Sequence, residues 1–169
     1  MDHTHMVKLM THNANRIRAA VGGVSPEAAR WAPTPDSWSI LEVLNHLYDE
    51  EREDFRVRLD YILHHPGEPW PPINPQGWVT ERGYNQRDLA ESLRGFLDER
   101  QISLAWLEGL RQADWDTPCQ TPFGTMQAGD MLASWAAHDL LHLRQLVELH
   151  RALLVQSAQP YAMDSAGPW

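Results

Sequence analysis

Cysteine and basic residues are both scarce in this sequence. A single cysteine, Cys119, is present among 169 residues. This excludes an internal disulfide framework and a zinc site built from cysteines, and we interpret Cys119 as an inert thiol in a loop. Lysine and arginine together number 14 against 23 acidic residues, which gives a net charge of −9. A chain of this charge is repelled by phosphate backbones, so nucleic acid is not an expected partner.

Long hydrophobic runs are also missing. No stretch approaches the roughly 18 consecutive apolar residues of a membrane span, and the first residues are polar, without the apolar core of a signal peptide. We therefore expect a cytoplasmic protein with no membrane partner. A hydrophobic content of 43% and a charged content of 22% are ordinary for a globular protein. At this length the simplest organisation is one domain, residues 1–169, with a substantial core.

Hydrophobic residues recur at helical spacing in four long segments of the chain. Ser39, followed by Glu42 three residues later, forms a capping box and predicts the start of the second segment. Pro66 and Gly67 end it. Four long helices without a convincing strand pair predict an all-α four-helix bundle. The expected helices are His5–Val21, Ser39–His64, Asn85–Arg111 and Asp130–Gln159.

Two long connections join the second helix to the third and the third to the fourth. Residues 65–84 contain five prolines, and the segment is too long for an ordinary helix connection. We consider two alternatives: a lid over a functional site, closed by Trp70 or Trp78, or a loop simply packed on the bundle. In residues 114–129, the prolines with Phe123 and Gly124 predict a turn or a short hairpin.

His138 and His142 are the main candidates for functional residues. They are four positions apart in the fourth expected helix, so they turn only ~40° around the helix axis and project from one face. They share that face with Met131 and Trp135, which should point into the core. Buried imidazoles are costly unless something binds them, and this spacing supplies two ligands to a divalent metal. The alternative is two unrelated histidines, one hydrogen-bonded in the core and one at a wet edge.

A third histidine would complete an open site of the catalytic type. The third expected helix has none, whereas the second offers His46 and, at its far end, His64. At ~100° per residue, His46 lies ~160° from the stripe of Leu44 and Tyr48. Either this part of the helix is buried on two sides or His46 faces solvent, and periodicity alone slightly favours solvent.

Two segments resemble the motifs of a known family, the DinB/YfiT-like superfamily. Residues 38–47 (WSILEVLNHL) are similar to its second-helix motif, and residues 123–126 (FGTM) with 138–146 (HDLLHLRQL) to its loop and fourth-helix motif. The resemblance implies a four-helix bundle that forms a homodimer. It also implies a divalent metal bound by His46, His138 and His142, which overrides the periodicity at His46. Zinc or nickel is the leading candidate, with iron and manganese as alternatives, because imidazole suits several metals.

Members of this superfamily include enzymes that use mycothiol, bacillithiol or glutathione in transferase or isomerase reactions. The resemblance therefore implies a metal-dependent enzyme acting on a small-molecule substrate, either a thiol-dependent transferase or a hydrolase. The alternative is a non-catalytic bundle that binds a metal or a small molecule. Glu50 lies one turn beyond His46 and is the candidate catalytic residue, as a general base. The alternatives are that Glu50 hydrogen-bonds a metal ligand, that it is itself a fourth ligand, or that it is a solvated carboxylate. Gln145 would bond a metal-bound ligand or be a core amide.

Overall fold

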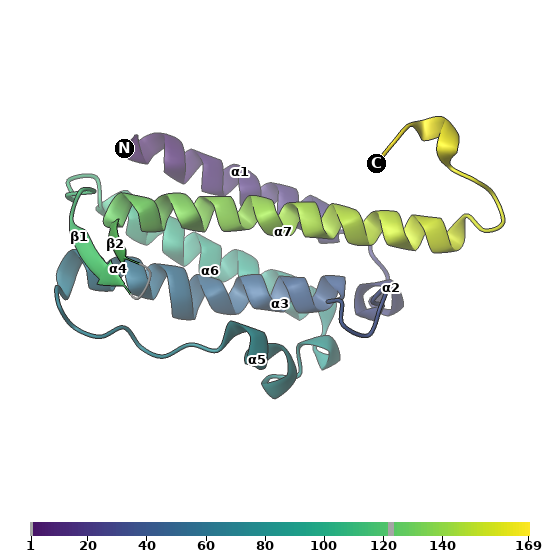
Figure 1. Cartoon of the computed structure of the whole chain (residues 1–169), viewed down its shortest axis with the longest axis horizontal. Coiled ribbons are helices and arrows are strands. Elements are labelled where there is room, and N and C mark those ends of the chain that lie inside the picture. Colours follow the sequence, from purple (N-terminus) through teal and green to yellow (C-terminus); the bar gives the residue numbers. More distant parts are fainter. Residues whose placement is uncertain (1, 122–123) are drawn as a thin grey trace.

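The computed structural model describes residues 2–121 and 124–169, and its long helices run side by side (Figure 1). This confirms the all-α four-helix bundle. One of the four columns is a continuous run of α3, the π-helical turn η1 and α4. The columns are α1 (His3–Val21), α3 (Ile40–Glu50) with η1 (Glu51–Phe55) and α4 (Arg56–His64), α6 (Leu89–Gly109) and α7 (Ala128–Ser157). The shorter elements are α2 (Pro26–Arg30), α5 (Pro75–Glu81), η2 (Tyr84–Gln86), β1 (Pro118–Thr121), β2 (Gly124–Gln127) and η3 (Asp164–Ala166).

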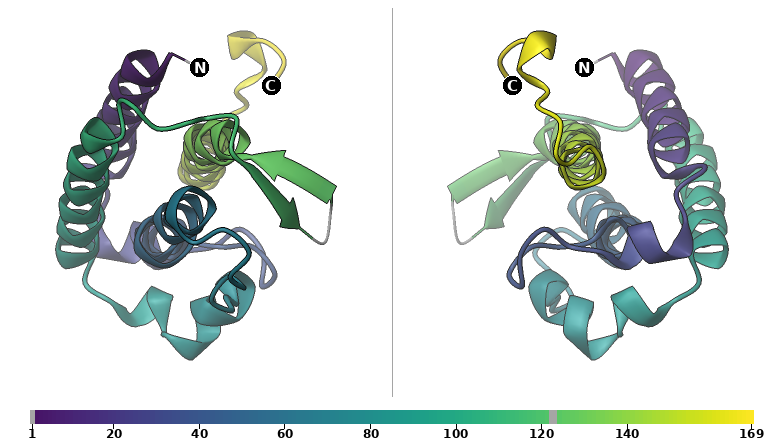
Figure 2. Two further views of the ribbon diagram at one scale, coloured as in Figure 1. Left: turned by 90° about the vertical axis from the view of Figure 1, so that its left-hand side faces the viewer. Right: turned by 90° about the vertical axis from the view of Figure 1, so that its right-hand side faces the viewer.

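The columns do not follow one another around the bundle in chain order. α1 packs against α6 and α7, and α3 packs against the same two helices, so α1 and α3 lie diagonally across the bundle (Figure 2). Helices α1 and α7 run in one direction, and α3 and α6 run in the other (Figure 1). The parallel pair α3 and α6 explains the long connection of residues 65–88, because the chain must return along the bundle before α6 begins.

A buried polar network crosses the core and joins all four columns. Arg100 of α6 is 1% exposed, and its guanidinium donates to both carboxylate oxygens of Glu51 and of Asp139 at 2.7–2.8 Å. Asn13 of α1 donates to Asp139 at 3.2 Å, and the Trp135 indole N–H donates to Glu51 at 3.0 Å. Because every buried charge has a partner, the network avoids the cost of an unpaired ion.

The second column begins as its sequence predicts. The Ser39 hydroxyl accepts from the Glu42 N–H at 3.2 Å, and the Glu42 carboxylate accepts from the Ser39 N–H at 2.8 Å. The expected single helix from Ser39 to His64 nevertheless contains a π-helical turn, Glu51–Phe55, that periodicity did not indicate. A π-turn fits one more residue into the helix than α-geometry does, so the faces on its two sides are out of register by ~100°.

The connection between α6 and α7 contains a short hairpin, which is one of the two forms that its sequence predicts. Strands β1 and β2 form an antiparallel hairpin in which Thr121 pairs with Gly124; Pro122 and Phe123, expected in its turn, lie outside the described residues. The third helix begins at Leu89 rather than Asn85, because the Asp88 side chain caps it by accepting from the Glu91 N–H. The fourth helix begins and ends two residues earlier than expected.

The connection between α4 and α6 covers the outer side of α3. Trp78, Val79 and Tyr84 are buried there, and the Tyr84 hydroxyl donates to Asp49 at 2.6 Å. Arg82 of the same connection pairs with Asp49 at 2.8 Å. Helix α3 is therefore buried on two sides, and the preference of periodicity for a solvent-facing His46 is wrong: His46 is 5% exposed. No helix of the described residues is both long and apolar enough to cross a membrane.

Candidate metal centre

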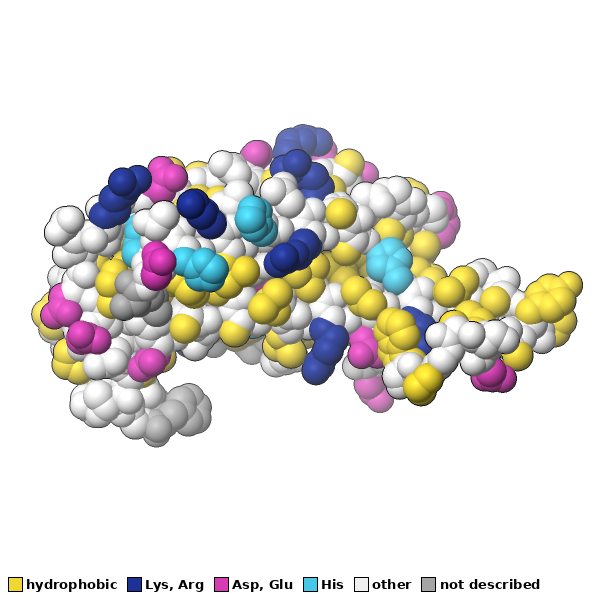
Figure 3. All heavy atoms as spheres, turned by 90° about the horizontal axis from the view of Figure 1, so that it is seen from above, with side chains coloured by type: hydrophobic (Ala, Val, Ile, Leu, Met, Phe, Trp, Pro, Cys, Tyr) yellow, Lys and Arg dark blue, Asp and Glu magenta, His cyan; other side chains and the backbone are white. Residues whose placement is uncertain are grey.

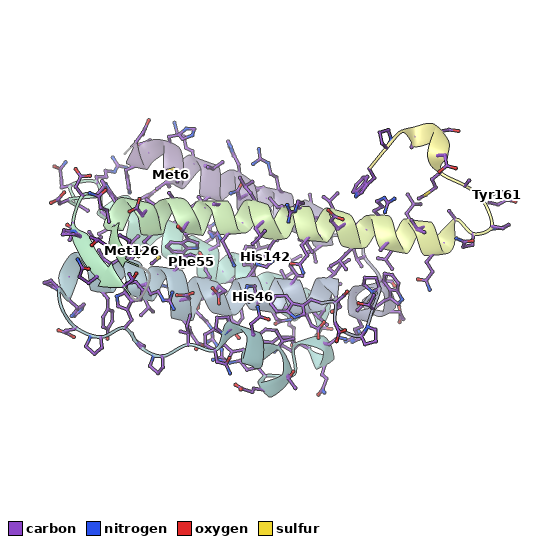
Figure 4. The ribbon with its side chains drawn as sticks, in the orientation of Figure 1. Met6, His46, Phe55, Met126, His142 and Tyr161 are labelled. Atoms are coloured by element: carbon purple, nitrogen blue, oxygen red, sulfur yellow. The ribbon has the colours of Figure 1, made fainter. Side chains whose placement is uncertain are left out.

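Three histidines converge between α3 and α7. Helix α3 supplies His46, and α7 supplies His138 and His142, one turn apart. Figure 4 shows His46 and His142 facing each other across the space between the two helices. The Nε2 atom of His138 lies 3.0 Å from that of His142 and 3.3 Å from that of His46. Ligand-type atoms of all three residues lie within 4.8 Å of one another, so the group can hold a metal ion.

The electrostatics of the three imidazoles suit a cation. Burial is the largest influence on each, and it lowers the pKa of His46 to about 3 and that of His138 to about 2. Burial also lowers the pKa of His142, and the hydrogen bond to the Gln145 side-chain oxygen opposes this shift. All three are therefore neutral at neutral pH and present lone pairs. Three neutral rings this close cannot all pair with one another, and a shared divalent ion satisfies all three nitrogens.

Neighbouring side chains orient the rings. Nδ1 of His142 lies 2.8 Å from Oε1 of Gln145; when this Nδ1 carries the proton and donates it, the Nε2 lone pair is left facing the cluster. Trp38 stacks on His142 with ring centroids 6.4 Å apart and contacts His46 at 4.9 Å. Phe55, placed by the π-turn, contacts His138 at 4.9 Å. The sequence does not mark Trp38 and Phe55 as site residues, because ring contacts across the bundle leave no local signal.

The three histidines lie at a cavity of about 810 Å³. Trp38, Gln145 and the N-terminal residues of α5, Pro75 and Gln76, also line it. Neither Trp70 nor Trp78 lines it, so neither tryptophan covers the three histidines in this structure, and a lid role for them stays a prediction. Asn74 before Pro75 is a helix-start signal, and it could have indicated α5.

Glu50 lies inside the same cavity and is 4% exposed. One of its oxygens, Oε1, has no hydrogen-bond partner among the described residues. Burial raises the pKa of Glu50 to about 9, and the neighbouring Asp54 adds to this shift. Glu50 is therefore not a solvated carboxylate. His64, the other histidine of the expected second helix, is exposed and bonded to Asp60 at 2.8 Å, outside the three-histidine group.

Fold and site together define a class: helical bundles in which two antiparallel helices gather three histidines at a cavity. A model of the DinB superfamily matches residues 9–146, and the chain belongs to this family. Among solved structures, it is similar to YfiT from Bacillus subtilis, described as "a probable metal-dependent hydrolase with an unusual four-helix bundle topology". The two share 16% identity with a TM-score of 0.77, over 89% of this chain and 87% of that one. No curated protein matches the chain.

Proposed function

We propose that this protein binds a divalent metal through His46, His138 and His142 and uses it to transform a small molecule. The observation that carries the proposal is the convergence of three neutral imidazole nitrogens within 4.8 Å at a cavity of about 810 Å³. Three protein ligands leave a coordination position open, which is the arrangement of catalytic rather than structural sites. Zinc and nickel are the leading metals, with iron and manganese next.

The reaction is hydrolysis or transfer to a low-molecular-weight thiol. The similarity in fold to YfiT, whose description names a hydrolase, supports water as the nucleophile. Membership of the DinB superfamily supports a thiol as the alternative. A divalent ion in this site would lower the pKa of a bound water or thiol and polarise the group that is attacked.

Other residues of the cavity would supply the proton transfer and hold the metal ligands in position. Glu50 holds a proton at neutral pH, because burial raises its pKa to about 9, and its side chain lines the cavity beside the histidines. It can therefore donate that proton to a leaving group as a general acid. The Gln145 side-chain oxygen, 2.8 Å from Nδ1 of His142, favours the tautomer in which Nδ1 carries the proton. Trp38 and Phe55 hold the imidazole planes and exclude water from their outer faces.

A homodimer is part of the proposal. Leu140, Val147 and Leu154 repeat every seven residues along α7 and are 46%, 48% and 55% exposed. Apolar residues at this spacing lie on one side of a helix and favour packing against a second helix. Light scattering on the purified protein measures the mass and tests this point.

Metal analysis of protein made without an affinity tag tests the central claim. After dialysis against zinc or nickel we expect about one ion per chain, because three histidines form one site. Less than half an equivalent would contradict the site. The loaded protein is then screened for ester and amide hydrolysis and for thiol transfer, with the metal-free protein as control. One bound ion without turnover in either screen would favour the non-catalytic metal-binding bundle.

A further inference from the structure

The outer part of the three-histidine cavity is lined by charged side chains of both signs. Asp36 comes from the connection before α3, and Glu148 and Arg151 come from α7. All three are exposed, and none of their side chains forms an ion pair or hydrogen bond within the described part of the chain. Glu148 and Arg151 are three residues apart and so are neighbours on the helix surface. A carboxylate and a guanidinium are therefore presented on one side of the helix without an ion-pair partner.

Arg151 contacts the segment that follows α7. Its guanidinium lies 5.1 Å from the centre of the Trp169 ring, and Figure 1 shows this segment bending back beside the end of α7. On the face seen from above, lysine and arginine side chains are spread among hydrophobic and histidine side chains (Figure 3). A cation–π contact reduces the freedom that the side chain loses on binding a ligand. A planar guanidinium so placed suits the two oxygens of a carboxylate.

The deeper part of the same cavity indicates independently that a ligand enters it. Glu50 is 4% exposed there, with one carboxyl oxygen unpartnered among the described residues. Buried polar atoms are nearly always hydrogen-bonded in folded proteins. Glu50 lines the same cavity as the three histidines, so a buried polar group without a full set of partners borders the space that a ligand would fill.

We propose that the substrate carries an amino-acid head group, with an ammonium and a carboxylate on one carbon, at the end remote from its reacting group. The ammonium binds Asp36 and Glu148, and the carboxylate binds Arg151. This inference rests on the proposed function, because the reacting group lies at the three histidines. Arg151 follows His142 by nine residues, a rise of ~13 Å along α7, and its side chain leans back toward the histidines. The substrate is therefore elongated.

Hydroxamates test the head group without knowledge of the reaction, because they chelate metal ions in open sites. Four kinds are compared on the zinc-loaded protein by calorimetry. Their remote end carries an ammonium and a carboxylate, the ammonium only, the carboxylate only, or neither. Each kind is prepared with spacers of two, four, six and eight methylene groups. Exposed ion pairs strengthen binding only modestly, so we expect the amino-acid form to bind about five- to tenfold more tightly than the plain form at its best spacer.

Variants assign each charge to its role. Arg151→Gln should remove the advantage of the carboxylate and keep that of the ammonium, whereas Glu148→Gln and Asp36→Asn should do the reverse. Trp169→Leu should reduce the carboxylate advantage. Arg144→Gln is the matched control, because Arg144 is exposed on α7 but does not line the cavity, and it should change nothing.

The outcomes separate this inference from the function on which it rests. Equal affinity for all four kinds at every spacer would overturn the inference, as would an Arg144→Gln effect equal to that of Arg151→Gln. Zinc binding without hydroxamate binding would also overturn the inference and leave the metal site standing. Failure to bind zinc would overturn the proposed function itself.

Discussion

At the scale of single residues, the three imidazoles should contribute comparably to metal binding. We expect His46→Ala, His138→Ala and His142→Ala each to weaken zinc binding by about a hundredfold or more, because loss of a mere supporting partner already costs ten- to a hundredfold. Calorimetric titration with zinc measures the effect, and circular dichroism checks that each variant folds.

The controls for these variants are histidines outside the group. His12 is exposed on α1, and His150 bonds the Ala20 carbonyl, so His12→Ala and His150→Ala should bind zinc like the unchanged protein. Unchanged affinity in His46→Ala, beside losses in the other two ligand variants, would show that the third ligand is a different group. Glu50, in the same cavity, would be the first to examine.

The sequence predicts the pair on α7 but not the position of the third histidine. A four-residue step places His138 and His142 on one face whatever surrounds the helix, and the structure brings them together. The burial of His46 depends on the packing of α7 and Trp38 against that side of α3, which is tertiary information. The spacing of Glu50 from His46 predicts that both lie on one side of the helix, but the burial of Glu50 is also tertiary and does not follow from the acidic run around it.

At the scale of elements, the capping box at Ser39 fixes where α3 begins and so where Trp38 meets His142. The Ser39 hydroxyl also donates to Asn85 at 3.0 Å, which ties the connection before α6 to the helix start. We expect Ser39→Ala to lower the free energy of unfolding by about 1–2 kcal/mol, because a helix cap and this bond are lost. Urea unfolding of the metal-free protein measures it.

Ser25→Ala provides the comparison for this prediction. Ser25 also caps a helix, by accepting from the Ala28 N–H, but α2 has only five residues and the bond is exposed. Its loss should be clearly smaller. A Ser25→Ala cost equal to that of Ser39→Ala would show that the cap of α3 has no special weight in the fold.

The sequence predicts where the long helices lie far better than it predicts whether each helix is uninterrupted. The spacing of hydrophobic residues, together with proline and glycine at the ends, predicts all four columns. The capping box of Ser39 and Glu42 predicts the N-cap residue of α3 correctly. The π-turn Glu51–Phe55 left no such mark, because its residues are ordinary helix formers whose register is set by the Arg100 network and by Phe55 against Trp135. Helix α5 is not predicted for another reason. Its segment is rich in proline, which favours a loop, although Asn74 and Pro75 form a helix-start signal.

At the scale of the whole molecule, buried ionisable groups should make the stability of the metal-free protein depend on pH in two directions. His46 and His138 have folded pKa values of about 3 and 2, below their ordinary 6.5, so the unfolded chain takes up more protons and stability falls as pH drops below about 6.5. Glu50 has a folded pKa of about 9 against 4.5, so the unfolded chain releases a proton and stability falls as pH rises from 4.5 to 9.

Glu50→Gln isolates the second of these effects. The amide cannot ionise, so we expect the variant to lose less stability than the unchanged protein between pH 6.5 and 9, measured as the urea midpoint at each pH. Glu108→Gln, at an exposed position of α6, should follow the unchanged protein. Identical pH profiles for Glu50→Gln and the unchanged protein would mean that Glu50 is ionised in the folded state.

Because His46 lies far from His138 and His142 in the sequence, a bound metal would also act as a cross-link between distant parts of the chain. His46 and His138 are 92 residues apart, so an ion held by both would close a loop of that length, as a disulfide does in other proteins. Closing so long a loop restricts the unfolded chain, and an ion that binds only the folded form stabilises it in proportion to the logarithm of the free metal concentration. A chain with one cysteine would thereby acquire a reversible cross-link, formed by metal supply rather than by oxidation.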